Sequence, residues 1–229
     1  RMTFGLSILD QSTIASGRGA DAAIQETLAL ARLADDWGYG RYWLAEHHNS
    51  ASHAGSAPEM LVAAIAATTR RIRVGTAGVM LPHYAALKVA EQFKVAEAIA
   101  PGRIDLGVGR APGSDGRTAF ALNPNAQEAA DRFPNQVMDV LGWLGEGLPE
   151  GHPFRQVVAN PQVPTRPEVW ILGSSDYGAQ VAAYFGLPYC FAHFIGEQGS
   201  EQVMALYREG FRAHPDRPGR LGAPHAAIA

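Results

Sequence analysis

The sequence predicts an α/β fold in which a parallel sheet is covered by helices. Short apolar runs alternate with helical patterns and give six consecutive strand–helix units. The predicted strands are apolar on both faces, which is typical of strands buried between layers of helices. The 229 residues are 47% apolar and 18% charged, a composition and length that support a substantial core. The order of elements alone does not separate a barrel from a doubly wound sheet.

The first half of the chain predicts evenly spaced units. A strand is expected at 4–9, followed by a helix from about residue 22 that Asp21 caps and that ends at Trp37, before Gly38 and Gly40. Pro58 suits the first turn of a later helix, because its missing N–H needs no partner there. The further elements are strands at 42–46, 72–80 and 104–109 and helices at 58–70 and 85–100.

The second half is less regular. Residues 110–125 are polar and rich in Gly, Pro, Ser and Asp, and they predict a long functional loop. The further elements are helices at 127–144, 177–185 and 201–211, strands at 169–172 and 189–194, a short extra strand at 155–158 within a Pro-rich segment, and the start of a seventh strand at 225–229. No linker divides the chain, so residues 1–229 are expected to form a single domain.

Charge and cysteine content narrow the classes of function. Lys and Arg number 19 against 22 Asp and Glu, and the absence of any basic run argues against nucleic acid as a partner. No apolar stretch approaches the roughly 20 residues that span a bilayer, and the N-terminus lacks the order of a signal peptide. Cys190 is the single cysteine, and its apolar neighbours predict a buried thiol. We therefore expect a cytoplasmic protein without a membrane partner.

The run Glu46-His47-His48-Asn49 ends the second predicted strand. Adjacent strand residues face opposite ways, so His47 and His48 are poorly placed to chelate one metal, and no zinc motif is present. Strand ends are where parallel α/β proteins gather ligand groups. One imidazole near a substrate, as acid, base or hydrogen-bond partner, is as well supported as a purely structural histidine.

Two glycine-containing turns could hold an anion. In Gly107-Val108-Gly109-Arg110-Ala111-Pro112-Gly113 the third glycine is displaced from the dinucleotide-binding pattern, but Arg110 offers a planar donor set for phosphate or a carbonyl oxygen. In Gly173-Ser174-Ser175-Asp176, between a strand and a helix, free N–H groups and two hydroxyls suit phosphate. A surface arginine in the first turn, and simple helix capping by Ser175 or Asp176 in the second, are the competing interpretations.

Taken together, the motifs at 43–49, 74–82, 101–113 and 170–175 resemble those of the bacterial-luciferase-like flavin-dependent monooxygenases, specifically their non-luminescent members. The similarity covers nearly the whole chain in the same order. The resemblance implies a TIM-like (βα) barrel with FMN at the carboxyl ends of its strands. A complete barrel of this type needs about 250 residues, so we expect the barrel in this chain to be incomplete at its C-terminus.

The resemblance also assigns roles to residues at the flavin ring. The residue matching His47 lies near the reactive edge of the flavin and takes part in catalysis. The segment matching Ala77 and Gly78 packs under the isoalloxazine ring, commonly through a non-prolyl cis peptide. Ser174 stands where the luciferases carry a carboxylate, so light emission is not expected.

At the other end of the cofactor, Arg110 and Ser175 match positions that hold the FMN phosphate. The backbone around Tyr177 and Gly178 matches the rest of that phosphate site.

The chemistry implied is the reaction of reduced FMN with O2 to a C4a-peroxide, which oxygenates a small organic substrate that the sequence does not identify. Reduced flavin is expected from a separate reductase, because no nicotinamide fingerprint is present. The resemblance also implies a homodimer that associates through the helices after the second and third strands, as relatives do. Two alternatives remain: hydride transfer with the deazaflavin F420, and a non-catalytic flavin-binding protein.

Overall fold

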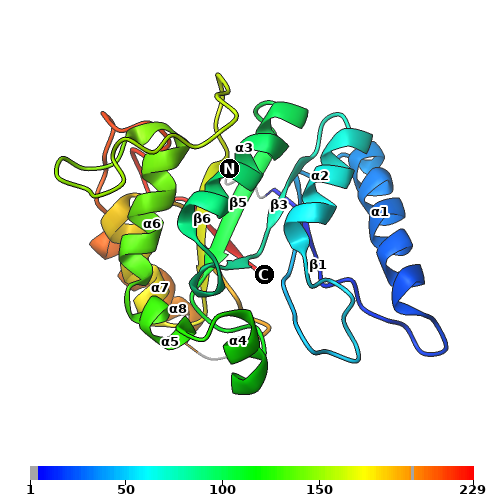
Figure 1. The fold of residues 1–229 in the computed structure, drawn as a ribbon. Coiled ribbons are helices and arrows are strands. Elements are labelled where there is room, and N and C mark those ends of the chain that lie inside the picture. The colour runs from blue at the N-terminus through cyan, green and yellow to red at the C-terminus, as the bar shows by residue number, and fades with distance from the viewer. Residues whose placement is uncertain (1–4, 197–198) are drawn as a thin grey trace.

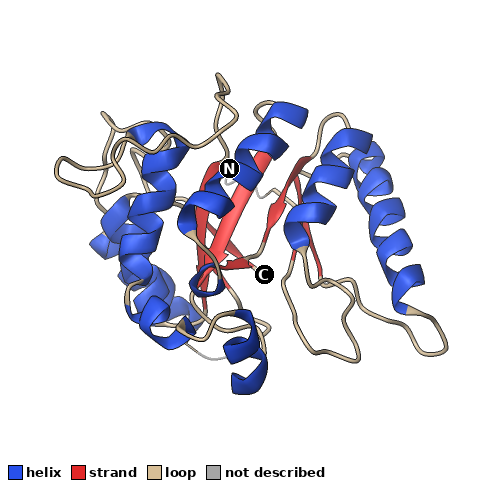
Figure 2. Ribbon diagram, viewed as in Figure 1, coloured by secondary structure: helices blue, strands red, loops and turns tan. Residues whose placement is uncertain are grey.

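The computed structural model describes residues 5–196 and 199–229, and its centre is a parallel sheet (Figures 1 and 2). In the described part of the chain the sheet has eight strands in the order β1-β2-β3-β5-β6-β7-β8, with β4 beside β5. The strands follow the order of the chain without a reversal. A doubly wound sheet reverses its order at a switch point, so the fold is an open TIM-like barrel, as expected.

The bounds of the elements are as follows. The strands are β1 (Ser7–Asp10), β2 (Arg41–Leu44), β3 (Arg73–Thr76), β4 (Val79–Met80), β5 (Ile104–Gly109), β6 (Glu168–Gly173), β7 (Tyr189–Phe191) and β8 (Ala226–Ile228). The helices are α1 (Ala20–Trp37), α2 (Pro58–Thr68), α3 (Ala86–Ile99), α4 (Gly116–Leu122), α5 (Ala126–Asp131), α6 (Phe133–Leu141), α7 (Asp176–Phe185) and α8 (Ser200–Gly210), with a 3-10 turn η1 (Leu81–His83) and a π turn η2 (Gly142–Glu146).

Most of the predicted elements are confirmed. β8 is the strand expected to begin at 225–229, and it pairs with β7. The strand expected at 72–80 is two strands, β3 and β4, separated by Ala77 and Gly78. The helix expected at 127–144 is also divided, because Pro134 in the first turn of α6 lacks the N–H that would continue α5. At α1 the capping prediction is wrong: Gly19 is the N-cap residue and Asp21 lies in the first turn.

Two predictions for the irregular regions are also wrong. The segment at 110–125 is not a loop throughout, because Asp115 accepts hydrogen bonds from the backbone N–H groups of Arg117 and Thr118 and so starts α4. Residues 155–158 are exposed and form no strand. Their backbone is bonded locally, with the N–H of Val157 donating to the carbonyl of Phe154 at 2.8 Å.

Side chains of the sheet alternate between two buried surfaces. Those facing outward pack against the helices and form the main core, for example Tyr42, Val74 and Ile104. Those facing the interior of the open barrel form a second cluster of Trp43, Ala77, Trp170 and Cys190. This alternation explains why the strands are apolar on both faces, and it confirms that Cys190 is a buried free thiol.

The interior is narrowest between β3 and β5. A Cβ atom on Gly75 would lie 2.3 Å from the carbonyl oxygen of Asp105, and one on Gly107 would lie 2.0 Å from that of Thr76. Any larger residue would push the strands apart. The two glycines therefore make room for the side chains beside them: Trp43 and Trp170, which pair with Gly75 and Gly107 in the sheet, meet with 4.9 Å between their ring centroids.

The amino-terminal end of the interior is filled by charge pairs. Asp105, fully buried, accepts hydrogen bonds from Arg41 at 2.6 Å, from Arg73 at 2.6 Å and from the indole N–H of Trp43 at 2.8 Å. Arg41 also donates to Glu168 at 3.2 Å. These groups stand near the first residues of their strands, where they close one end of the open barrel with paired charges.

Candidate active site

The predicted site residues follow the carboxyl ends of four neighbouring strands: β2, β3, β5 and β6. Because the strands are parallel, these ends meet at one edge of the sheet. In Figure 1 the loop between β2 and α2 and the helix α4 both lie on the lower side of the view. The side chain of Asn49 donates to Asp115 at 3.1 Å and joins the two segments.

His47 is partly buried in the loop after β2. Its backbone N–H donates to the carbonyl of Gly55 at 2.9 Å, and its ring is stacked on that of His53 with 4.6 Å between ring centroids. Its Nδ1 atom is buried and has no hydrogen-bond partner among the described residues. Burial, together with the neighbouring His53 and His48, lowers the pKa of His47. A neutral imidazole is therefore favoured near neutral pH, one that can accept a proton.

Glu46 lies beside it and is fully hydrogen-bonded within the protein. Its Oε1 accepts from the hydroxyl of Tyr84 at 2.6 Å and lies 2.7 Å from Nε2 of His48, and its Oε2 accepts from the backbone N–H of Met80 at 2.9 Å. Burial and this bond to Glu46 raise the pKa of Tyr84. The carboxylate thus ties the end of β2 to β4 and to η1.

Ala77 and Gly78 lie at the end of β3, joined by a non-prolyl cis peptide bond. The backbone N–H of Ala77 donates to the carbonyl of Leu44 at 2.7 Å, so the segment continues the sheet. A Cβ atom on Gly78 would lie 2.8 Å from the carbonyl oxygen of Gly107 and 2.9 Å from Leu172. The segment is therefore packed closely against the backbone of β5 and the side chain of Leu172.

Arg110, Ser175 and Tyr177 are brought together at the ends of β5 and β6. The guanidinium of Arg110 lies 4.3 Å from the centre of the Tyr177 ring. Ser175, Tyr177 and Gly199 line a depression of about 440 Å³ at the starts of α7 and α8. Ser174, Asp176, Gln202 and Val203 complete the lining, and Arg110 stands next to it through its contact with Tyr177. The hydroxyls, the two helix N-termini and the nearby cation suit an anion such as phosphate, whereas the carboxylate of Asp176 opposes one.

Two details of this region differ from simple capping. Ser175 occupies the N-cap position of α7, but its hydroxyl makes no capping hydrogen bond, and Asp176 is already the first helical residue. Gly178 does not line the depression. It is buried in α7, where a Cβ atom would contact Tyr189 at 3.4 Å, so it allows the close approach of α7 to the sheet.

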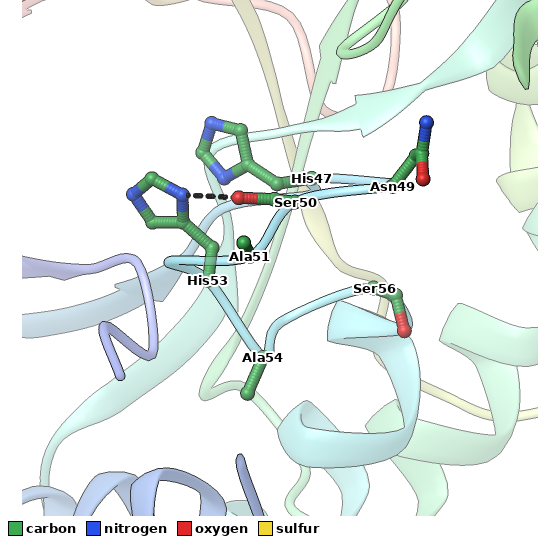
Figure 3. A pocket seen from close by; sticks show the side chains of 7 residues that line it. All are labelled: His47, Asn49, Ser50, Ala51, His53, Ala54 and Ser56. Atoms are coloured by element: carbon green, nitrogen blue, oxygen red, sulfur yellow. Dashed lines mark hydrogen bonds between the residues drawn. The ribbon is translucent and has the colours of Figure 1, made fainter. Parts of the chain in front are cut away.

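His47 and Ser175 line two different depressions. The one beside His47 has a volume of about 470 Å³ and is lined by His47, Asn49, Ser50, Ala51, His53, Ala54 and Ser56 (Figure 3). Its polar lining comes from a single loop. The sequence therefore located both regions, although the structure places them at separate strand ends and not in one cavity.

Three further residues shape the site and were missed by sequence reasoning. His53 stacks on His47, Tyr84 binds Glu46, and the buried Ser12 in the loop after β1 accepts a hydrogen bond from Thr27 at 2.9 Å. Ser12 and Tyr84 lie far in sequence from the run at 46–49, and His53 follows that run in the same loop but belongs to no motif. The polar run at 47–56 was the only signal that pointed to His53.

Comparison with known proteins decides the family. The family model described as luciferase-like monooxygenase matches residues 2–228. This chain belongs to the luciferase-like monooxygenase family. The chain is 48% identical over 225 residues to the uncharacterized protein YwcH of Bacillus subtilis (98% of this chain, 66% of the relative). It is 43% identical over 224 residues to the N-acetyl-S-alkylcysteine monooxygenase of the same organism (98% and 66%).

Solved structures of this family share the fold. The crystal structure of apo-MsnO8 matches with a TM-score of 0.88 at 39% identity and covers 98% of this chain and 65% of that one. More distant structures show the fold alone. The oxygenating constituent of 3,6-diketocamphane monooxygenase from Pseudomonas putida, in complex with FMN, has a TM-score of 0.72 at 20% identity (91% of this chain, 62% of that one). An F420-dependent secondary alcohol dehydrogenase has a TM-score of 0.71 at 14% identity (99% and 68%).

The luciferase-like chain described here spans about 66% of the length of the two Bacillus subtilis relatives. In the part of the chain that the structure describes, no helix combines the length and apolar character needed to cross a bilayer.

Proposed function

We propose that this chain binds FMN and serves as an FMN-dependent monooxygenase that uses reduced flavin and O2 to oxygenate a small organic substrate through a C4a-peroxyflavin. The observation that carries the proposal is the arrangement along one sheet edge. An anion site at Arg110 and Ser175, the cis-peptide segment at Ala77 and Gly78, and a neutral imidazole at His47 occupy neighbouring strand ends.

The residues present fit both ends of this cofactor. The guanidinium of Arg110 and the hydroxyl of Ser175 would hold the phosphate, with the N–H groups at the start of α7 around Tyr177 as further donors. Gly178 contributes by letting α7 lie close to β6. Ala77 and Gly78 would support the flat ring through their backbone, with the side chain of Leu172 beside them.

When bound and reduced, the flavin supplies the activation of O2. The side chains of this chain bind, orient and handle protons. His47 is the proposed catalytic residue, since its Nδ1, which has no partner among the described residues, can take or return a proton at a group beside it. Glu46, Tyr84 and Met80 hold the adjoining backbone in place.

Several properties of the whole protein belong to the same proposal. We propose residues 1–229 as one domain, a cytoplasmic location and a separate flavin reductase as a partner. A homodimer would form through α2 and α3, which expose Met60 (69%), Val95 (48%) and Ile99 (43%).

The first experiment tests the cofactor. FMN, riboflavin and F420 are titrated separately into the purified chain, and binding is followed by flavin fluorescence. We expect FMN to bind more tightly than riboflavin, because riboflavin lacks the phosphate. Binding of F420 alone would favour the hydride-transfer alternative, and equal binding of FMN and riboflavin would contradict the phosphate site.

The second experiment tests catalysis. The His47→Ala variant is compared with the unaltered chain for oxygen consumption with chemically reduced FMN and for product formation with thioether test substrates, a choice guided by the relative named for N-acetyl-S-alkylcysteine. Loss of a general acid or base lowers the rate by about 100- to 10,000-fold. Identical decay of the oxygenated flavin in both proteins would favour a non-catalytic flavin-binding protein.

A further inference from the structure

The ring of His53 covers one face of the catalytic candidate His47. The two imidazoles are 4.6 Å apart between centroids and inclined by only 24°, and both line the same depression (Figure 3). His53 reaches this place from the far side of the loop between β2 and α2. The stacked arrangement leaves the ring edges, which carry the nitrogen atoms, directed away from the partner ring.

His53 is held there by both its side chain and its backbone. Its Nδ1 lies 2.9 Å from Oγ of Ser50 and 3.0 Å from Oγ of Ser52. Its backbone forms an antiparallel bridge with Thr13, and the N–H of Ile14 donates to the carbonyl of Ser52 at 2.8 Å. The ring is thus fixed against the loop after β1, independently of His47.

Two imidazolium rings in this stack would place like charges face to face. At this separation, and with one ring partly buried, protonation of one ring disfavours protonation of the other. His48 adds further positive charge when it is protonated, and Glu46 acts in the opposite direction. Glu59 interacts electrostatically with both Glu46 and His48, and the ring of His83 lies 6.2 Å from that of His48 between centroids.

We propose that His53 is a positioning residue for His47: its stacked ring fixes the plane of the His47 ring and opposes the addition of a proton to it. The inference rests on the proposed function of His47 as the proton-transferring group. In this inference His53 orients the base His47 and does not itself contact the reacting atoms.

The sign of the resulting pH dependence follows from this arrangement. A histidine whose folded-state pKa is lowered binds its proton less readily in the folded than in the unfolded chain. The pair therefore favours the folded state least when pH falls below the ordinary histidine value of about 6.5. Activity that needs neutral His47 should persist to lower pH than an isolated imidazole would allow.

The experiment measures the titration of His47 directly in the flavin-free protein. Imidazole resonances of the ¹⁵N-labelled full chain are followed from pH 5 to 8, and His47 is assigned with a His47→Gln variant. His53→Phe retains a ring to stack but removes the charge, and His53→Gln removes both ring and charge while keeping a polar group for Ser50. His214→Phe, in the segment after α8, is the matched control.

We expect the midpoint of His47 to shift upward in both His53 variants and to stay unchanged in His214→Phe. An unchanged midpoint in His53→Phe would overturn the proposal, as would a shift only in His53→Gln, because packing alone would then account for it. FMN titration of the same variants is measured separately. If the unaltered chain does not bind FMN, the proposed function is refuted, but a measured coupling between the two imidazoles would still stand.

Discussion

The two ends of the same strands are built in opposite ways. At the amino-terminal end, Asp105 satisfies Arg41, Arg73 and the indole of Trp43, and the guanidinium of Arg41 lies 5.0 Å from the ring centre of Trp170. At the carboxyl-terminal end, His47 keeps a buried nitrogen without a partner among the described residues. The groups at the amino-terminal end thus stabilise the barrel by pairing with one another, whereas His47 lies with an unpaired nitrogen at the end where parallel α/β barrels bind their ligands.

Glu46 is the exception that sharpens this comparison. It lies at the carboxyl-terminal end, yet it is as completely paired as Asp105. The pairing fixes the loop from which His47 projects. The hydrogen bonds that stabilise this end are therefore made by Glu46, next to the catalytic candidate His47, and not by His47 itself.

The largest effect on folding is expected for Asp105→Ala. This change leaves two largely buried guanidinium groups without their shared carboxylate, and we expect a loss of about 3 kcal/mol in the free energy of unfolding, measured by urea denaturation. The matched control is Glu128→Gln, which removes an exposed ion pair with Arg132 at 2.6 Å and should cost less than about 0.5 kcal/mol. Equal losses in the two variants would contradict a special role for the amino-terminal end.

A smaller loss is expected for Glu46→Gln. The amide keeps one acceptor but introduces a donor opposite Tyr84 or Met80, and hydrogen bonds to a charged group contribute about 1.5–3 kcal/mol. Stability is again measured in urea. His47→Ala serves as the comparison, because His47 is hydrogen-bonded through its backbone N–H and its ring makes no hydrogen bond to a described residue. A greater loss for His47→Ala than for Glu46→Gln would break the division between supporting and chemical groups.

Arg110→Ala should change ligand binding without changing stability appreciably. The side chain is exposed and its recorded contact is with the ring of Tyr177. We expect FMN affinity to fall several-fold or more, while the affinity for riboflavin, which has no phosphate, changes little. An equal loss for both ligands would show that Arg110 acts on the ring or on the fold instead.

The smallest effect is expected at Cys190 in the interior of the barrel. Burial raises the pKa of this thiol to about 12. The folded chain should therefore resist alkylation at pH 8 and react only after unfolding in urea. Between pH about 9 and 12 the unfolded chain releases this proton more readily than the folded one, so stability should decline as pH rises. Rapid alkylation of the folded chain would show that the interior is open at that level.

The regular part of the fold could be predicted because its information is local. The strand at 104–109 matches β5, and the start of α2 at Pro58 follows from its missing N–H. The short strand expected at 155–158 is absent because no neighbouring strand is available to bond it, and β-pairing is a property of two segments. α4 depends on one side chain, Asp115, within a segment whose composition indicates a loop.

The site could be predicted in its parts and not in its assembly. His47, Arg110 and Ser175 belong to motifs at strand ends, so sequence alone located them. The stacking of His53 on His47 depends on how one loop folds back on itself, and the bond from Tyr84 to Glu46 joins segments far apart in the sequence. No local pattern encodes either contact. Ser175 occupies the N-cap position of α7, as one interpretation of the sequence had it, but its hydroxyl makes no capping hydrogen bond. The sequence thus indicates where a side chain lies but not which hydrogen bonds it makes.

The narrow gap between β3 and β5 limits how such a scaffold can acquire new specificity. Gly75 and Gly107 already have no side chain, so no smaller residue can replace them. A larger one does not fit, because a Cβ atom on Gly107 would lie 2.0 Å from the backbone carbonyl oxygen of Thr76. Laboratory evolution toward larger substrates would thus accumulate changes in the exposed segments around the site, such as 110–125, and leave Gly75 and Gly107 unchanged.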